Sequence, residues 1–165
     1  MDNIIEKAKK YWTDAGRTGL GHYRAAEIYA KRHRRIGIPS VIMSTIVATS
    51  IFSTLSETVD VRLRIATGVV ALIAAILAAL QAFLGFGERA EKHKAAGGRY
   101  GKVRRDIDIF QLKFGTATGA SRDDALKRLQ AIADELGALA TDSPTLAEMV
   151  YAAGKKSFDR EHPLK

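Results

Sequence analysis

Two long runs without a single ionisable side chain occupy the middle of this sequence. They cover residues 36–55 and 65–86, and only residues 56–64 separate them. A helix of about twenty residues is roughly 30 Å long, which is the thickness of the hydrocarbon core of a bilayer. Because the connection is so short, the second helix must return antiparallel beside the first. The two runs therefore predict a transmembrane helical hairpin.

The alternative is a soluble helical bundle in which both apolar helices are buried on every side. The chain has 165 residues, and those outside the two runs are too few to surround two helices that are apolar all round. Uncharged runs longer than about eighteen residues are also typical of membrane spans. We therefore predict an all-α membrane protein, in which the hairpin continues into a cytoplasmic helical bundle.

The positive charge of the chain collects beside the two runs. The formal net charge is +8, and lysines and arginines precede the first run and follow the second. The loop between the runs has two arginines and two acidic residues. An excess of lysine and arginine marks the cytoplasmic side of a span. Both termini are therefore predicted to be cytoplasmic.

These flanking cations predict contact with anionic lipid headgroups. The residues concerned are Arg32, Arg34, Arg35, Arg89, Lys92 and Lys94. No stacking aromatic residues are interleaved with them, so a sequence-specific nucleic-acid partner is not predicted. The predicted organisation is an N-terminal cytoplasmic helical region (1–35), a first span (36–55), an extracytoplasmic loop (56–64), a second span (65–86) and a C-terminal cytoplasmic helical region (87–165).

Small residues recur every four positions in the second run. They form two overlapping stripes, Ala71-Ala75-Ala79 and Ala74-Ala78-Ala82. Small side chains let helix backbones approach closely in lipid. Two stripes therefore predict two helix contacts, one within the hairpin and one with a neighbouring subunit of a homo-oligomer. The alternative is that alanine only fills a permissive helix.

Polar side chains inside the runs are candidates for a permeation path. Thr45, Thr49 and Ser53 share one face of the first run, and Gln81 is the one amide in either run. The hydroxyls could line a wet path in an oligomer, or they could bond carbonyls of their own helix. Gln81 could form a ring around a symmetry axis or reach towards the interface. Because neither run contains a charge, a proton relay or voltage sensor is not supported.

Gly37 and Pro39 stand at the entry to the first run. Proline is tolerated at the first position of a helix but clashes inside one. We therefore predict a break or kink at this point, acting as a hinge between a cytoplasmic helix and the span.

The polar ends of the chain predict further helices. Residues 2–35 are predicted to be helical with an interruption at the glycine-rich residues 16–21. After the second run we expect a helix, a break at residues 115–120, a helix capped by Ser121 and a short helix starting at Ser143-Pro144. The stripes at three-four spacing are Tyr100, Val103, Ile107, Phe110 and Phe114, then Ala125, Leu129, Ile132, Leu136 and Leu139, and in the last helix Leu146, Val150 and Tyr151.

Catalytic and metal-binding patterns are missing from the sequence. There is no cysteine, and the four histidines have neither ligand spacing on one helix nor a carboxylate partner. No phosphate-binding loop or nucleophile elbow occurs. We therefore predict no enzyme activity, no cofactor and no metal site. His22 and His93, both on predicted cytoplasmic helices near the membrane, are expected to pack together.

Several segments around the two runs resemble one bacterial family. They are Trp12, GHYRAA (21–26), RIGIP (35–39), AALQAFLGF (78–86), ERAEKHKAAGGRYG (88–101), RRDID (104–108) and LKRLQAIADELGALATDSP (126–144). Their order and spacing are similar to those of the SLATT family, the SMODS and SLOG-associating two-transmembrane effectors. The resemblance covers most of the chain.

This resemblance implies a function in bacterial anti-phage defence. It implies an effector that oligomerises and permeabilises the inner membrane as a pore or channel, causing abortive infection. The implied triggers are a nucleotide signal or a partner encoded nearby, such as a nucleotide-signal synthetase, a SLOG-type sensor or a reverse transcriptase. The alternative is a passive membrane anchor that recruits a soluble partner through its cytoplasmic helices.

Overall fold

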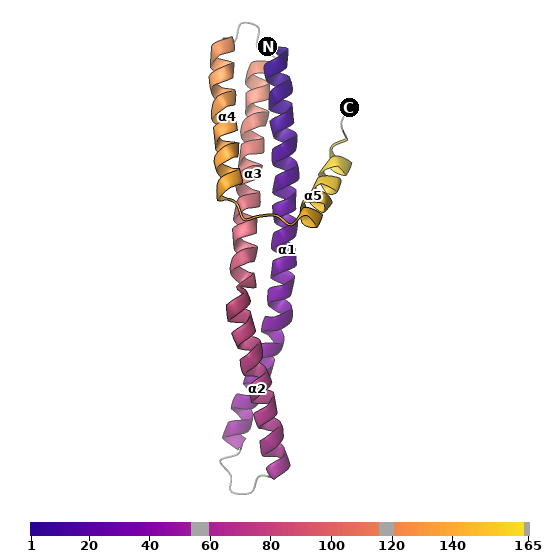
Figure 1. The fold of residues 1–165 in the computed structure, drawn as a ribbon, viewed down its shortest axis with the longest axis vertical. Helices are drawn as coiled ribbons and strands as arrows, with labels where there is room; N and C mark the ends of the chain where they lie inside the picture. The colour runs from indigo at the N-terminus through magenta and orange to yellow at the C-terminus, as the bar shows by residue number, and fades with distance from the viewer. Residues whose placement is uncertain (54–59, 116–120, 164–165) are drawn as a thin grey trace. The chain divides into compact units, whose positions relative to one another are not determined.

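The computed structural model describes residues 1–53, 60–115 and 121–163, with side chains from 1–50, 60–115 and 121–163. These residues form five α-helices and no strand, which confirms the all-α prediction. The helices are α1 (Asp2–Ser53), α2 (Val61–Leu84), α3 (Phe86–Gly115), α4 (Arg122–Asp142) and α5 (Glu148–Glu161) (Figure 1).

The chain divides into two compact units. We call residues 1–27 and 90–165 the bundle unit, and residues 28–89 the hairpin unit. The bundle unit holds the start of α1, most of α3, and all of α4 and α5. The hairpin unit holds the rest of α1 together with α2, so α1 contributes to both.

The core of the bundle unit lies between α1, α3 and α4. Its buried residues are Ile4, Ala8 and Ala15 of α1, Tyr100, Val103, Ile107, Phe110 and Phe114 of α3, and Ala125, Leu129, Ile132 and Leu139 of α4. Leu136 packs against this core while partly buried. The two longer predicted stripes are therefore confirmed as core faces. Their alternating three-four spacing keeps one side of each helix turned to its neighbours.

The start of α4 agrees with its predicted cap. The hydroxyl of Ser121 accepts a hydrogen bond from the backbone N–H of Asp124 at 3.4 Å, and Asp123 and Asp124 occupy the first turn. Carboxylates there complement the positive end of the helix dipole. The predicted break at residues 115–120 lies largely outside the described residues.

The start of α5 was predicted wrongly. Ser143 has extended backbone angles, because the following Pro144 disfavours a helical conformation at the residue before it. The helix begins only at Glu148, so Leu146 lies in the connection that precedes it.

The predicted interruption at residues 16–21 is also wrong, because α1 runs through them. Three glycines there let neighbours approach closely. A Cβ on Gly16 would lie 2.1 Å from the ring of Phe158, and one on Gly19 would lie 3.2 Å from the Cβ of Tyr100. A Cβ on Gly154 would lie 2.6 Å from the backbone nitrogen of Gly21. Glycine here permits helix packing instead of ending the helix.

The ends of α2 differ by a few residues from the predicted second span. The helix starts at Val61, because the Asp60 carboxylate accepts a hydrogen bond from the backbone N–H of Arg62 at 2.9 Å. It ends at Leu84, where Gly85 adopts a left-handed conformation with φ 56°. Residues 54–59, with the end of the first run and much of the loop, lie outside the described residues.

Within the described residues, one helical segment is long and apolar enough to cross a membrane. This is Val61–Gly115, which comprises α2 and its continuation as α3. Only 6% of its most apolar stretch is buried. The other described residues therefore leave the apolar surface of α2 largely uncovered.

Candidate functional site

The hairpin unit contains most of the candidate site residues, and its two helices pack along a narrow seam. In α1 the seam residues are Ile36, Ser40, Met43, Val47 and Ser50, and in α2 they are Val70, Ala74, Leu77, Gln81 and Leu84. Ser40 and Ala74 are buried and the others are half-buried. Both sets alternate spacings of three and four, the repeat that keeps two helices in contact along their length.

Gly37 and Gln81 meet across this seam. A Cβ on Gly37 would lie 3.1 Å from both the Nε2 and the Oε1 of Gln81. The glycine therefore makes room for the amide of the neighbouring helix. Pro39 lies inside α1, which continues through it to Ser53. The predicted break is absent, whereas movement at this hinge stays a prediction.

The hydroxyl face of the first run is exposed, and its described hydroxyls bond their own helix. The hydroxyl of Thr45 donates to the carbonyl of Val41 at 2.9 Å, and that of Thr49 donates to the carbonyl of Thr45 at 2.6 Å. The side chain of Ser53 lies outside the described residues. One of the two sequence-based alternatives, bonding to the helix's own carbonyls, is thus realised in the single chain. Their contact with water in an oligomer stays a prediction.

The small-residue stripes of α2 lie mostly away from the seam. Ala74 is buried and Ala71 is half-buried. The remaining members are exposed, and they are Ala75, Ala78, Ala79 and Ala82. Within the hairpin, only the first residues of the two stripes, Ala71 and Ala74, are covered. The later alanines form an exposed face of small side chains.

The cations beside the runs differ in how they are held. The guanidinium of Arg32 lies 6.0 Å from the ring centre of Tyr29 and 5.9 Å from that of Phe86, so two aromatic faces support it. Arg34, Arg35 and Arg89 are exposed in the same unit. Lys92 and Lys94, which belong to the bundle unit, are exposed as well.

The bundle unit contains a buried histidine pair. The Nδ1 atoms of His22 and His93 are 3.0 Å apart, and the ring of His22 stacks on Tyr100 with centroids 5.6 Å apart. Burial and the neighbouring charge of His93 lower the pKa of His22 to about 4, and burial lowers the pKa of His93. The predicted packing of these two residues is confirmed. The pair is held neutral near pH 7.

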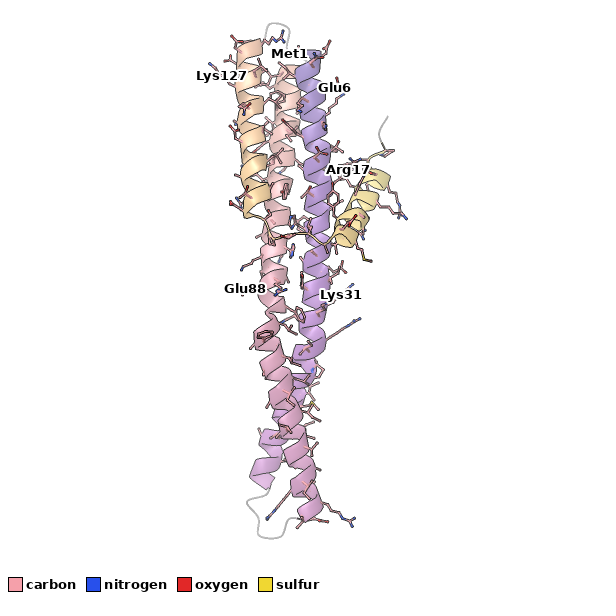
Figure 2. The ribbon with its side chains drawn as sticks, viewed as in Figure 1. Met1, Glu6, Arg17, Lys31, Glu88 and Lys127 are labelled. Carbon is pink, nitrogen blue, oxygen red and sulfur yellow. The ribbon has the colours of Figure 1, made fainter. Side chains whose placement is uncertain are left out.

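Sequence reasoning missed a second polar cluster, which fastens α5. The guanidinium of Arg104 lies 4.1 Å from the ring centre of Trp12 and 5.1 Å from that of Phe158, and it contacts the Nε2 of His162 at 3.2 Å. Arg17 extends towards α5 (Figure 2), where its Nε donates to the Oδ1 of Asp159 at 2.8 Å. The one available signal was the glycine-rich segment of α1, which marks where α5 packs.

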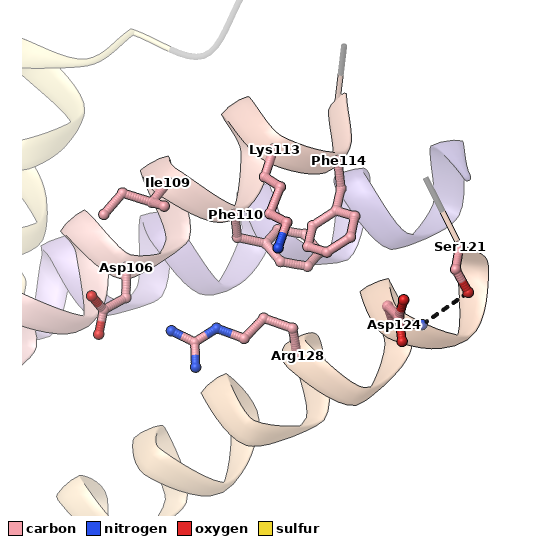
Figure 3. A pocket seen from close by; sticks show the side chains of 8 residues that line it. All are labelled: Asp106, Ile109, Phe110, Lys113, Phe114, Ser121, Asp124 and Arg128. Atoms are coloured by element: carbon pink, nitrogen blue, oxygen red, sulfur yellow. Dashed lines mark hydrogen bonds between the residues drawn. The ribbon is translucent and has the colours of Figure 1, made fainter. Parts of the chain in front are cut away.

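A pocket of about 470 Å³ lies between α3 and α4 (Figure 3). Asp106 and Lys113 line it from α3, and Asp124 and Arg128 from α4. The charges are mixed, and the described residues contain no group of three potential metal ligands. The pocket therefore has no arrangement typical of catalysis or of metal binding.

Comparison with known proteins identifies one family. Residues 17–162 match the family described as SMODS and SLOG-associating 2TM effector domain family 4. No curated protein and no solved structure matches the chain. The match includes all of α2, α3 and α4 and extends through α5.

Proposed function

We propose, from the premise that this chain belongs to the SMODS and SLOG-associating 2TM effector family, that it permeabilises the bacterial inner membrane as a homo-oligomer. Members of this family are membrane effectors of conflict systems. In the proposed mechanism the effector responds to infection through a partner or a nucleotide signal, and the leak it causes arrests the infected cell.

The observation that carries the membrane location is the exposure of large apolar side chains on α2. Leu72 is 63% exposed, Ile76 is 50% exposed and Phe83 is 86% exposed. Each such side chain costs about 1.5–3 kcal/mol when it is left in water instead of buried. Several of them on one helix make lipid the better solvent for this surface.

A two-span topology follows from the same reasoning applied to α1. Ile38, Val41, Ile42 and Ile46 are each more than half exposed beyond the cationic flank. With both flanks positive, we propose that α1 and α2 each cross the bilayer and that both termini are cytoplasmic. Cysteines introduced as Thr58→Cys and Thr118→Cys test this orientation. An impermeant thiol reagent added to intact cells should label the first and spare the second, and the reverse result would overturn it.

Oligomerisation is required because one hairpin cannot enclose water. Every backbone group in a bilayer must be satisfied against protein, and two helices leave no interior for a channel. The exposed alanine face of α2 supports a contact between copies, because small side chains allow backbones to approach. The cytoplasmic bundle would receive the signal, from a nucleotide-signal synthetase, a nucleotide sensor or a reverse transcriptase encoded nearby.

Release of a trapped dye from liposomes tests the proposal. The purified full chain should release the dye, and Ala78→Leu should reduce both release and oligomer mass by blocking close approach. Leu72→Ile, which changes an exposed apolar residue without changing its size, is the matched control. A chain that inserts fully yet stays monomeric and releases no dye, also when supplied with its signal or partner, would instead support a passive anchor.

A further inference from the structure

A groove opens on the hairpin unit where the cationic flank of α1 meets its apolar part. Its volume is about 330 Å³. The residues that shape it are His33, Arg34, Ile38, Val41 and Ile42 of α1 and Gln81 of α2. Of the candidate residues for a permeation path, Gln81 alone lines the groove, which lies outside the predicted hydroxyl and alanine stripes.

The groove changes from charged to apolar along its length. Arg34, Ile38, Val41 and Ile42 follow one another at helical spacing, so they share one face of α1. From Arg34 to Ile42 the helix rises about 12 Å. The three apolar side chains are 57%, 66% and 54% exposed. We call Ile38, Val41 and Ile42 the apolar wall of the groove. A ligand that fills the groove should therefore be anionic at the end beside Arg34 and apolar over several carbon–carbon bonds along this wall.

The charged end also offers hydrogen-bonding groups. The amide of Gln81 lies at this end, placed there by its close approach to Gly37. The ring of His33 also lines this end of the groove, with its Nδ1 covered on the side of Gly87. Anions bind where cationic and neutral donors meet beside a surface that excludes water.

We propose that this groove binds one anionic phospholipid per chain. Its phosphate would contact Arg34 and its acyl chain would lie along Ile38, Val41 and Ile42. This inference rests on the proposed membrane location. The inference adds a specific lipid-binding site to that membrane location. The basic flank by itself predicts only a general attraction to a negatively charged surface.

Two other occupants fit the groove less well. A free inorganic or small organic phosphate would satisfy Arg34 but would leave the apolar wall uncovered. A second hairpin would cover the wall but carries few anions for Arg34, since residues 28–89 contain three acidic residues, Glu57, Asp60 and Glu88, none of which lies within the two uncharged runs. An anionic lipid supplies both parts, and the positive charge of Arg34 at the groove makes a neutral lipid a poorer match.

Native mass spectrometry of the full chain in mild detergent measures this binding directly. With added phosphatidylglycerol we expect one retained lipid per chain, and with phosphatidylcholine at the same concentration we expect none. Arg34→Gln should weaken retention about tenfold, because it removes a charge-assisted contact with the phosphate. Arg35→Gln removes the same charge outside the groove and should change retention less than twofold. An equal loss of retained lipid in both variants would indicate that general electrostatic attraction, and not the groove, holds the lipid. This result would overturn the proposal.

A second pair of variants tests the apolar wall and does not depend on the charge. Ile38→Trp fills the groove and should abolish retention, whereas Leu72→Trp adds similar bulk on the exposed surface of α2, outside the groove, and should leave it intact. Glycerol 3-phosphate in large excess should not displace the lipid, and displacement would identify a site for free phosphate instead.

The failure of this inference can be distinguished from the failure of the proposed function. Dye release in the absence of selective lipid retention would overturn the lipid site in the groove while leaving the proposed function standing. Failure of the chain to enter liposomes would overturn the membrane proposal itself.

Discussion

The bundle unit and the hairpin unit use the same helical spacing but differ in how deeply their large apolar side chains are buried. In the bundle unit the stripe turned inward carries Phe110, Ile107 and Ile132, which are almost fully buried. In the hairpin unit only Ser40 and Ala74 of the seam are buried, the larger seam residues such as Met43 are half-buried, and many other large apolar side chains are exposed. The difference shows that three-four spacing sets which face packs, whereas the surrounding solvent decides where large apolar residues can lie.

The largest expected effect comes from making one substitution in both units. Phe110→Ala removes a fully buried ring of the bundle unit and should destabilise it by about 4 kcal/mol, since a cavity replaces the ring. Phe83→Ala removes an exposed ring of α2 and should change the unfolding free energy of the bundle by less than about 0.5 kcal/mol. Thermal unfolding in detergent, followed by circular dichroism, measures both. Similar losses would remove the distinction between the units.

The outward-facing residues of the two units provide the next comparison. Leu72 on α2 and Leu112 on α3 are 63% and 72% exposed. Leu72→Arg should lower membrane insertion, because an arginine near the centre of a span costs about 3 kcal/mol. Leu112→Arg should leave insertion unchanged, because this part of α3 is predicted to be cytoplasmic. The measurement is the fraction of the chain that resists carbonate extraction from membranes. An equal resistant fraction for the two variants would contradict the proposal that α2 lies in the bilayer and this part of α3 in the cytoplasm.

Acid should destabilise the bundle unit through its histidine pair. The pKa of His22 is lowered from 6.5 to about 4, so the unfolded chain takes up protons that the folded chain resists. The stability contributed by the neutral pair is therefore fully present above pH 6.5 and is lost as the pH falls towards 4. Between pH 7 and pH 5 we expect a loss of about 2 kcal/mol.

Thermal unfolding at the two pH values measures this loss. His22→Gln keeps a neutral polar group at the site and should remove more than half of the pH dependence. A variant as sensitive to acid as the parent would assign the effect to other groups.

The smallest expected effect concerns the hydroxyl face of α1. Thr45→Val with Thr49→Val should change stability by no more than about 0.5 kcal/mol, because both hydroxyls bond carbonyls of their own helix. We expect dye release at matched membrane levels to be unchanged for the same reason. Reduced release would place this face in the lining of a permeation path, where valine would dewet the wall.

Much of the local structure could be predicted because it depends on nearby residues. The stripe on α3 and the Ser121 cap follow from spacing and from hydrogen bonding over one turn. The contact of His22 with His93 followed from placing both residues on neighbouring helices beside the hairpin. The glycines of residues 16–21 misled the prediction, because low helix propensity was offset by packing against Phe158 and Tyr100, which lie far away in the sequence.

The amino-acid sequence by itself determined the helical class, the apolar runs and the faces that pack, because charge and hydrophobic periodicity act over one or two turns. Only the tertiary structure decided where α5 docks, and it did so through the Arg104 cluster and the glycines beneath Phe158 and Gly154. It also decided that Gln81 lies against Gly37 and that the groove opens beside Arg34. Such contacts join residues that are distant in the chain, and they depend on the depth and rotation of whole helices, which local spacing does not specify.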